Sequence, residues 1–207
     1  SLYEALTSSG NVPRTVDNNG KPTPVTITGV QRRCTIDTLP NPGEGRPHGL
    51  YGNAFGRASE MQIVSATRRV SPPTITNILA MAAPSCGFGK YTLGEITDIL
   101  DAAFTGFSAA CLESTQIAGE KYRTAINTGF WGCGAFGGNR SLMTVLQALA
   151  ADLADVDIIF WVGHDGLDTA REAYELYNGF RSATISVENI LKEIVRIGFQ
   201  WGESDGN

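Results

Sequence analysis

The sequence predicts an α/β protein in which strands and helices alternate along the second half of the chain. Residues 157–162 form a short apolar run typical of a buried strand. Before it, apolar residues recur at helical spacing, at Leu142, Val145, Leu146, Leu149 and Leu153. A glycine-rich loop joins this helix to an earlier strand-like run, residues 122–127. This order indicates parallel β–α units with right-handed crossovers, in a mixed, largely parallel sheet flanked by helices.

The bulk composition is that of a globular domain. With 207 residues, the chain suits a single domain over residues 1–207 that buries its own core. Hydrophobic residues make up 42% and charged residues 18%, which excludes a disordered tail. The net charge of −5 argues against a protein that coats nucleic acid by charge, so direct DNA binding is not expected.

Neither a membrane segment nor a metal site is indicated. No apolar run reaches the roughly 18 residues of a membrane span, and the first residues lack a basic and apolar leader. We therefore expect a soluble protein without a membrane partner, with an intracellular (cytoplasmic or nuclear) location favoured. The four cysteines form no C-x-x-C pair and there are only two histidines, which argues against a zinc site and a Cys–His nucleophile. No cofactor is expected.

The first half of the chain predicts strands and turns. Residues 1–7 are typical of a short helix, and residues 17–21 of a tight turn. Residues 25–30 alternate like a strand that residues 31–36 continue or follow with a second strand. Three prolines and two glycines between residues 39 and 47 predict a surface loop. The apolar run 76–83, ended by Pro84, predicts a buried parallel strand.

Three amphipathic helices are predicted from caps and apolar faces. Thr92 and Glu95 form a capping box before a stripe of Ile96, Ile99, Leu100, Ala103, Phe104 and Phe107. Asp165 is the expected N-cap of a helix whose face carries Leu167, Ala170, Tyr174 and Tyr177. Ser186 should cap a last helix with Ile190, Leu191, Ile194, Val195 and Ile197, after which the chain should fray from Trp201 onward.

The loop from Thr128 to Ser141 is the strongest functional candidate. Five of its fourteen residues are glycine, yet they alternate with Phe130, Trp131 and Phe136, so it is no flexible linker. Because it joins a strand to a helix, with Asn139 or Ser141 as the N-cap, its N–H groups and the helix end suit a bound anion. The alternative is a tight turn without a ligand. The common phosphate-loop motif does not fit, since no Lys-Ser or Lys-Thr follows the glycines, and the G-x-G-x-x-G spacing at residues 132–137 is weak alone.

The string Thr-Gly-Phe-Trp-Gly-Cys-Gly-Ala-Phe-Gly-Gly-Asn, the helix after it and the strand 157–162 resemble the C-terminal half of the poly(ADP-ribose) glycohydrolase catalytic domain. The resemblance extends from about Thr74 to about Phe180. It implies a macrodomain-like fold of three layers, and a loop that wraps the diphosphate of ADP-ribose. The loop residues that it assigns are Gly132, Cys133, Gly134, Ala135, Phe136, Gly137 and Gly138.

The resemblance also implies walls for the adenine and its ribose. In the family, a loop like residues 49–56 carries a tyrosine that stacks on adenine; here Asn53 stands near that place and Tyr51 or Phe55 would substitute. The alternative is that both rings pack under a loop. Phe130 stands where the animal enzymes have asparagine. His164 either acts on a substrate near neutral pH or is an ordinary hydrogen-bonding or surface residue. In the family, an aromatic residue close to this turn packs on the sugar beside the adenine, and here His164 stands near that place.

The catalytic acid is not identified. The family carries three glycines followed by Gln-Glu-Glu, whose second glutamate is the general acid, and this signature is not among the 207 residues. The nearest acids to the candidate loops are Glu44, Glu60 and Asp165, none of them after three glycines. Since residues 1–6 resemble the segment that follows the glutamates in bacterial-type members, we expect the chain to begin just after the catalytic loop and to lack the family's N-terminal strands. A companion N-terminal peptide, an acid placed elsewhere, and a module that never cleaves are the competing explanations.

The resemblance therefore implies an ADP-ribosyl glycohydrolase that cleaves ribose O-glycosidic linkages of ADP-ribose polymers or ADP-ribosylated proteins. The alternative is a non-catalytic ADP-ribose-binding module, with ADP-ribose or an ADP-ribosylated protein as the partner in either case. A third reading is a structural domain that binds another phosphate ligand. The sequence does not indicate which linkage is the substrate, nor the oligomeric state.

Overall fold

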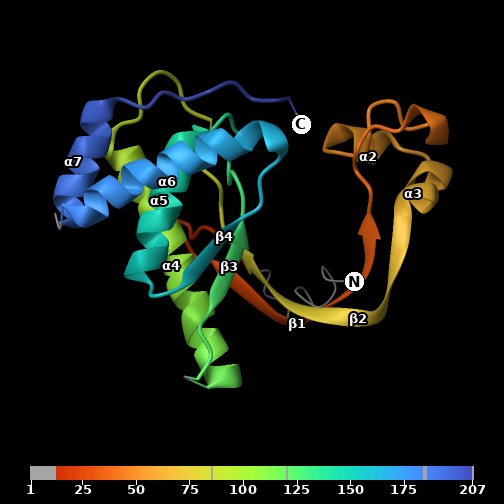
Figure 1. Cartoon of the computed structure of the whole chain (residues 1–207), viewed down its shortest axis with the longest axis horizontal. Helices are drawn as coiled ribbons and strands as arrows, with labels where there is room; N and C mark the ends of the chain where they lie inside the picture. Colours follow the sequence, from red (N-terminus) through yellow and green to blue (C-terminus); the bar gives the residue numbers. More distant parts are fainter. Residues whose placement is uncertain (1–12, 85, 120, 184–185, 207) are drawn as a thin grey trace. The chain divides into compact units, whose positions relative to one another are not determined.

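The computed structural model describes residues 13–84, 86–119, 121–183 and 186–206, so the helix expected over residues 1–7 lies outside the described residues. These residues form two compact units (Figure 1). Unit 1 contains the described residues up to Thr26 and those from Leu79 to Gly206, and unit 2 is the insertion Ile27–Ile78. A single domain over residues 1–207 stays a prediction. No helix in the described ranges combines the length and apolar character that crossing a membrane requires.

Unit 2 is a two-stranded ribbon closed by short helices. Strand β1 (Val25–Ile36) pairs with β2 (Thr67–Ala80), and the two arrows run in opposite directions in Figure 1. Between them lie η1 (Pro42–Glu44), α2 (Asn53–Arg57) and α3 (Glu60–Ala66). The N–H of Asp37 donates to the carbonyl of Ala66 at 3.0 Å, which closes the ribbon beyond β1. The expected strands at 25–30 and 31–36 are therefore one continuous strand.

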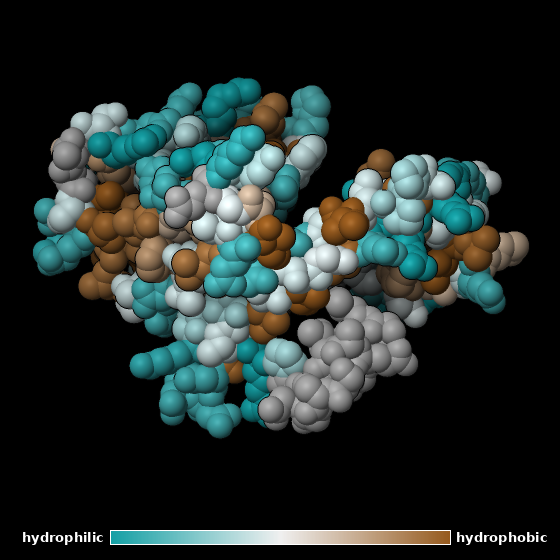
Figure 2. Space-filling model, turned by 90° about the horizontal axis from the view of Figure 1, so that it is seen from below, coloured by the Kyte–Doolittle hydropathy of each residue, from teal (hydrophilic) through white to brown (hydrophobic). Residues whose placement is uncertain are grey.

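The buried parallel strand predicted over residues 76–83 is wrong. The strand ends at Ala80, pairs with β1, and is exposed from Ser71 to Ile78. Ile75 leaves 72% of its surface exposed, because a two-stranded ribbon has no second layer to cover it. Figure 2 shows apolar side chains at the surface of both units among polar ones. An apolar run alone did not distinguish a buried strand from a ribbon.

Unit 1 contains the alternating strands and helices that the sequence predicts. Its elements are α4 (Leu93–Ala118), β3 (Ala125–Thr128), α5 (Arg140–Leu153), β4 (Asp157–Phe160), η2 (His164–Gly166), α6 (Leu167–Ser182) and α7 (Val187–Ile197). Strands β3 and β4 are parallel, with Ala125 opposite Asp157 and Thr128 opposite Phe160. The protein is thus mixed α/β with two small sheets. A larger, mostly parallel sheet is not confirmed among the described residues.

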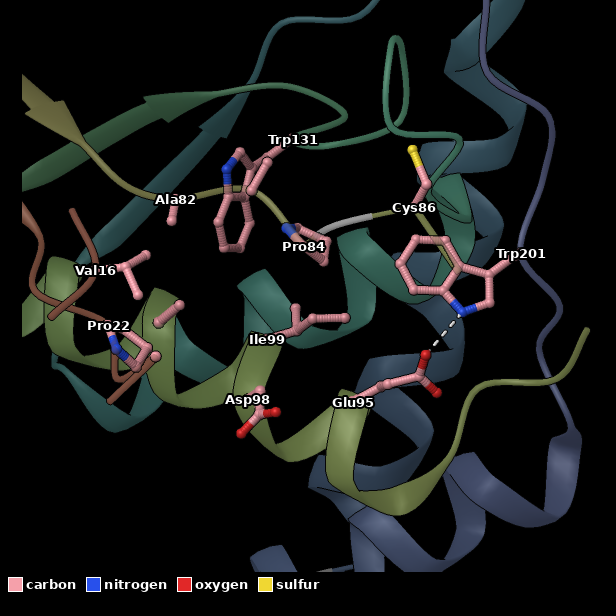
Figure 3. Close-up of a pocket in the computed structure, with 13 residues that line it drawn as sticks. Val16, Pro22, Ala82, Pro84, Cys86, Glu95, Asp98, Ile99, Trp131 and Trp201 are labelled. Atoms are coloured by element: carbon pink, nitrogen blue, oxygen red, sulfur yellow. Dashed lines mark hydrogen bonds between the residues drawn. The ribbon is translucent and has the colours of Figure 1, made fainter. Parts of the chain in front are cut away.

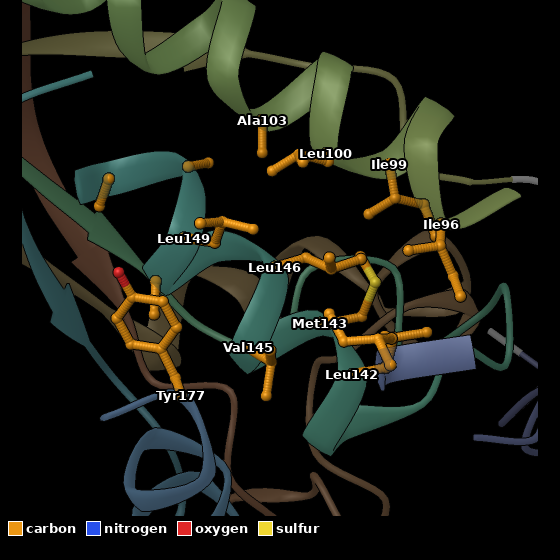
Figure 4. Packing of buried hydrophobic residues seen from close by; sticks show 14 of the residues in the cluster. Ile96, Ile99, Leu100, Ala103, Leu142, Met143, Val145, Leu146, Leu149 and Tyr177 are labelled. Atoms are coloured by element: carbon orange, nitrogen blue, oxygen red, sulfur yellow. The ribbon is translucent and has the colours of Figure 1, made fainter. Parts of the chain in front are cut away.

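Helix α5 is the centre of the apolar core. It packs between α4 and α6 and against β4, and its residues from Leu142 to Ala151 are buried. The stripe predicted on α4 is confirmed except at Phe104, whose side chain is 39% exposed. Figure 4 shows the α4 and α5 side chains meeting in the core. On α7, Ile190 and Ile194 complete this core.

Most predicted caps are confirmed. The Thr92–Glu95 capping box is complete, Asn139 caps α5 by accepting the N–H of Leu142, and Ser186 caps α7. Asp165 is not the N-cap of α6, because residues 164–166 form a 3₁₀ turn and Gly166 occupies that position. On α6, Ala170 and Tyr177 are buried, whereas Leu167 and Tyr174 are 48% and 44% exposed.

The expected fraying from Trp201 onward is also wrong. Residues 201–206, here called the C-terminal strap, lack regular secondary structure but lie against the glycine loop. The indole of Trp201 stacks on Tyr91 with ring centroids 4.2 Å apart, and its N–H donates to Glu95 at 3.2 Å. A terminal segment held by its own side chains remains ordered.

Candidate functional site

The glycine loop begins at a buried polar anchor. Gln147 on α5 is fully buried, and its side-chain oxygen accepts the hydroxyl of Thr128 at 2.7 Å. Its amide nitrogen donates to the carbonyl of Gly129 at 3.1 Å. A buried polar group that loses such partners costs about 1–3 kcal/mol. The last residue of β3 and the first of the loop are therefore fixed to the helix that follows them.

The loop then folds back on itself through glycines. The N–H of Gly138 donates to the carbonyl of Gly132 at 2.9 Å, and a Cβ at residue 138 would lie 2.7 Å from that oxygen. Gly132 and Gly137 have φ of +75° and +64°, a conformation that favours glycine. The glycines are thus required by close approach and backbone conformation.

Four amides of this loop have open donors. Five N–H groups between residues 131 and 139 have partners within the protein. Those of residues 131, 133, 137 and 138 donate to the carbonyls of residues 129, 130, 134 and 132, and that of Asn139 donates to the hydroxyl of Tyr91. The N–H groups of Gly132, Gly134, Ala135 and Phe136 donate to no described residue. Successive unpaired amides beside a helix N-terminus are suited to an anion. The loop thus presents open N–H donors beside the start of α5, and its role as a diphosphate site stays a prediction.

A cation lies at the same end of α5. The guanidinium of Arg140 lies 5.0 Å from the centre of the Phe130 ring, and its Nη1 is 3.2 Å from an oxygen of Asp165. Both charged side chains are largely exposed, so the pair itself is weak. Arg140 can therefore exchange Asp165 for an incoming anion. The sequence analysis missed this residue, although a basic residue directly after an N-cap asparagine was visible.

Phe130 and His164 lie on the two turns that follow the parallel strands. Phe130 packs on Gly166 so closely that a Cβ there would be 2.4 Å from the ring. His164 lies in η2 and is exposed. Phe136, within the loop, is 44% exposed. Residues 130 and 164 are thus brought to one edge of the β3–β4 pair, as expected for parallel strands.

Tyr51 and Phe55 lie in unit 2, in and beside α2, with 59% and 40% of their surfaces exposed. Two such exposed rings do not support the alternative in which both pack under a loop. Their role as adenine walls stays a prediction.

A cavity of about 350 Å³ lies in unit 1 beside the loop (Figure 3). Trp131 is the one residue from the glycine loop that lines it, and no residue of the assigned diphosphate set does. Glu95 and Asp98 contribute carboxylates to its wall.

The carboxylate of Glu95 is stabilised in its charged form. Burial acts to raise the pKa of Glu95, but hydrogen bonds from Thr92 and Trp201 outweigh this effect and hold the pKa below its usual value. Two carboxylates disfavour a diphosphate inside this cavity. The other lining residues are Val16, Gly20, Pro22, Ala82, Ala83, Pro84, Cys86, Ile99, Ala102 and Trp201.

Two titratable groups at the loop, Cys133 and Tyr91, are neutral at physiological pH. Burial raises the pKa of the Cys133 thiol to about 12, although Arg140 opposes the shift. Burial likewise raises the pKa of Tyr91 to about 12. Neither group is a thiolate or phenolate that would repel an anion. Within the described ranges, no three His, Cys, Asp or Glu side chains gather as metal ligands would.

The chain is similar in sequence to proteins of one family. The sequence profile of the family described as poly(ADP-ribose) glycohydrolase (PARG), macro domain fold, matches residues 48–167. The chain belongs to this family. Poly(ADP-ribose) glycohydrolase 2 of Caenorhabditis elegans is 25% identical over 149 residues, which cover 72% of this chain and 27% of that protein. The chain therefore spans about a quarter of the length of this curated relative.

The region that matches the poly(ADP-ribose) glycohydrolase family contains the glycine loop, Tyr51, Phe55, Phe130 and His164. It ends before the C-terminal strap, which contacts the loop from outside the matched region. No sequence pattern in Trp-Gly-Glu-Ser-Asp-Gly predicts this contact, which depends on two backbone N–H groups and the hydroxyl of Ser204.

Proposed function

We propose that this member of the poly(ADP-ribose) glycohydrolase family binds ADP-ribose by its diphosphate at residues Gly132–Gly138. The observation that carries the proposal is the set of four open amide donors in a loop directly before α5. Arg140 adds a positive charge beside them. Charge-assisted hydrogen bonds from backbone N–H groups are stronger than neutral ones.

The reaction that we propose is hydrolysis of a ribose O-glycosidic linkage in ADP-ribose polymers or ADP-ribosylated proteins. A carboxylic acid donates its proton to the leaving oxygen, and the bond from the anomeric carbon to that oxygen breaks. Water then adds to the anomeric carbon as the new hydroxyl, and its other proton returns to the carboxylate. The role of this chain's loop is to hold the diphosphate, and with it the ribose, in one position. The general acid is unassigned.

The proposal includes the domain organisation and the residues that contact the adenine and its ribose. We infer a single macrodomain over residues 1–207 with three layers. Phe130 and His164 are proposed as walls for the ribose, and Tyr51 or Phe55 for the adenine. Phe130 offers a ring where a carboxamide would offer a polar contact, so substrate handling is expected to differ from that of enzymes with asparagine there.

Calorimetry tests the binding step. We expect heat on titration with ADP-ribose that exceeds the heat with ATP or NAD at equal concentrations. Inorganic pyrophosphate should compete, because the loop recognises the diphosphate. Absent heat with ADP-ribose, or equal heat with all three nucleotides, would remove the proposal.

Turnover is tested separately on poly(ADP-ribose) and on an ADP-ribosylated protein. Release of ADP-ribose, followed by chromatography, supports a hydrolase. Binding without release would instead identify a binding module.

A further inference from the structure

The C-terminal strap holds the carbonyl side of the glycine loop. The N–H of Gly202 donates to the carbonyl of Gly137 at 2.8 Å, and the N–H of Asp205 donates to the carbonyl of Gly134 at 3.3 Å. The hydroxyl of Ser204 donates to the carbonyl of Ala135 at 2.6 Å. Three loop carbonyls thus have partners in one terminal segment.

These bonds also determine where two open amides point. In a trans peptide, the carbonyl of one residue and the N–H of the next lie in one plane and point in opposite directions. Because the carbonyls of Gly134 and Ala135 point to the strap, the N–H groups of Ala135 and Phe136 point away from it. Both N–H groups are among the four without a partner in the described residues.

The strap has anchors of its own beyond the loop. Trp201 stacks on Tyr91 at an interplanar angle of 18°, and its backbone N–H donates to the carbonyl of Gly89 at 2.8 Å. The side chain of Asn139, the N-cap of α5, donates to the carbonyl of Gln200 at 2.9 Å. The strap is therefore held to the starts of α4 and α5, and can hold the loop in turn.

The approach of strap and loop leaves no room for a side chain. A Cβ at residue 137 would lie 3.0 Å from the backbone of Gly202, Glu203 and Ser204. Gly137 is itself buried. The loop and the strap therefore behave as one packed unit.

We propose that the C-terminal strap positions the glycine loop for anion binding, and that Ser204 is a positioning residue in it. The inference rests on the proposed function, since it assumes a diphosphate at the open amides. Without the Ser204 bond, the carbonyl of Ala135 keeps only a long contact with the Cys86 thiol, at 3.9 Å, so the peptide between Ala135 and Phe136 can rotate and present its oxygen to the anion. When the strap fixes this peptide before the anion arrives, binding does not include the free-energy cost of ordering it.

The test compares Ser204→Ala, Ser204→Thr and Gln200→Ala with the wild-type chain. We expect Ser204→Ala to raise the Kd for ADP-ribose by about 3- to 10-fold, which is the effect of losing one net hydrogen bond. Threonine keeps the hydroxyl and should restore the affinity. Gln200→Ala is the control, because that side chain is exposed and makes no hydrogen bond with a described residue; its Kd should be unchanged.

A second measurement separates positioning from a general loss of structure. In protein labelled with ¹⁵N-phenylalanine, pyrophosphate should shift the amide signal of Phe136 in the wild type, and shift it less in Ser204→Ala at the same concentration. The melting temperatures of the two proteins should agree.

The outcomes distinguish the two proposals. If the wild type does not bind ADP-ribose, the proposed function fails and this inference fails with it. If the wild type binds and Ser204→Ala binds equally well, only the role of the strap is overturned. A third outcome would also overturn it: a raised Kd and a lowered melting temperature, with the pyrophosphate-induced shift of the Phe136 amide signal unchanged. The serine would then only stabilise the fold.

Discussion

The two compact units differ in what fills their interiors. Unit 1 has an apolar core of side chains from α4, α5, α6 and α7. Unit 2 has few buried residues, and the largest of them is Arg46, which is 2% exposed. Its guanidinium donates to the backbone carbonyls of Asp37 and Leu39 and contacts the carboxylates of Asp37 and Glu44.

This difference shows which unit can hold a ligand loop in one conformation. An apolar core stabilises in proportion to the area that it buries, and does so cooperatively. A buried arginine satisfied by carbonyls organises a turn but stabilises only its surroundings. The glycine loop belongs to unit 1, where α5 is buried along most of its length. The following variants test the comparison, from the largest expected effect to the smallest.

Leu146→Ala should lower the free energy of unfolding by about 2–5 kcal/mol, since Leu146 is fully buried and its removal leaves a cavity. Urea denaturation followed by circular dichroism measures this change. Leu112→Ala on α4 is the matched control, because that leucine is 67% exposed and should change the stability by less than about 0.5 kcal/mol. Similar losses for both variants would contradict a core centred on α5.

Gly137→Val should abolish ADP-ribose binding and lower stability less than Leu146→Ala does. The residue has a φ of +64°, which costs a branched side chain about 1–2 kcal/mol, and the new side chain displaces the strap. Calorimetry with ADP-ribose and a thermal melt of the same sample measure both effects. Gly56→Ala in α2 is the control, since a Cβ there meets nothing within 4 Å. A folded Gly137→Val protein with wild-type affinity would contradict the loop assignment.

Arg46→Met should loosen unit 2 and leave unit 1 intact. Methionine fills much of the same volume but donates no hydrogen bond, so the carbonyls of Asp37 and Leu39 lose a partner. Hydrogen exchange read by mass spectrometry should be faster in peptides from residues 37–66 and unchanged in peptides from α5. Arg32→Met on the exposed part of β1 is the control. Faster exchange throughout α5 would show that the two units unfold together.

The smallest effect concerns thiol reactivity. The thiolate is the reactive form, and burial raises the pKa of Cys133 to about 12, so little thiolate exists at pH 8. We expect iodoacetamide to label Cys133 in unit 1 at least about tenfold more slowly than the exposed Cys34 in unit 2. Raising the pH toward 12 should speed the Cys133 reaction. Peptide mass mapping measures both rates; equal rates at pH 8 would contradict the burial of Cys133.

The sequence predicted those elements whose signals are local. The capping box at Thr92, the N-caps at Asn139 and Ser186 and the apolar stripe of α4 depend on residues within a few positions of one another, and each is confirmed. The glycine loop was recognised because its glycines, aromatic residues and following helix are contiguous. Its open amides are the donors on which the proposed anion site depends, and that site stays a prediction.

The features that sequence reasoning missed depend on distant partners. Ser204 meets Ala135 across 69 positions, and Trp201 meets Glu95 across 106. The exposure of Ile75 depends on what does or does not cover the ribbon, which the apolar run could not indicate. Asp165 was expected as a cap by its type, but its carboxylate pairs with Arg140 instead.

The β1–β2 ribbon also has a consequence for how the chain tolerates insertions and deletions. Its two strands pair with each other, and the side chain of Asn77 accepts the N–H of Gly29 at 3.0 Å, so the points where the chain enters and leaves unit 2 are neighbours. Residues added or removed between Asp37 and Ala66 therefore leave the distance in space between residues 26 and 79 unchanged. The length of this insertion can vary without moving the ends of the chain segments that carry α4 and the glycine loop.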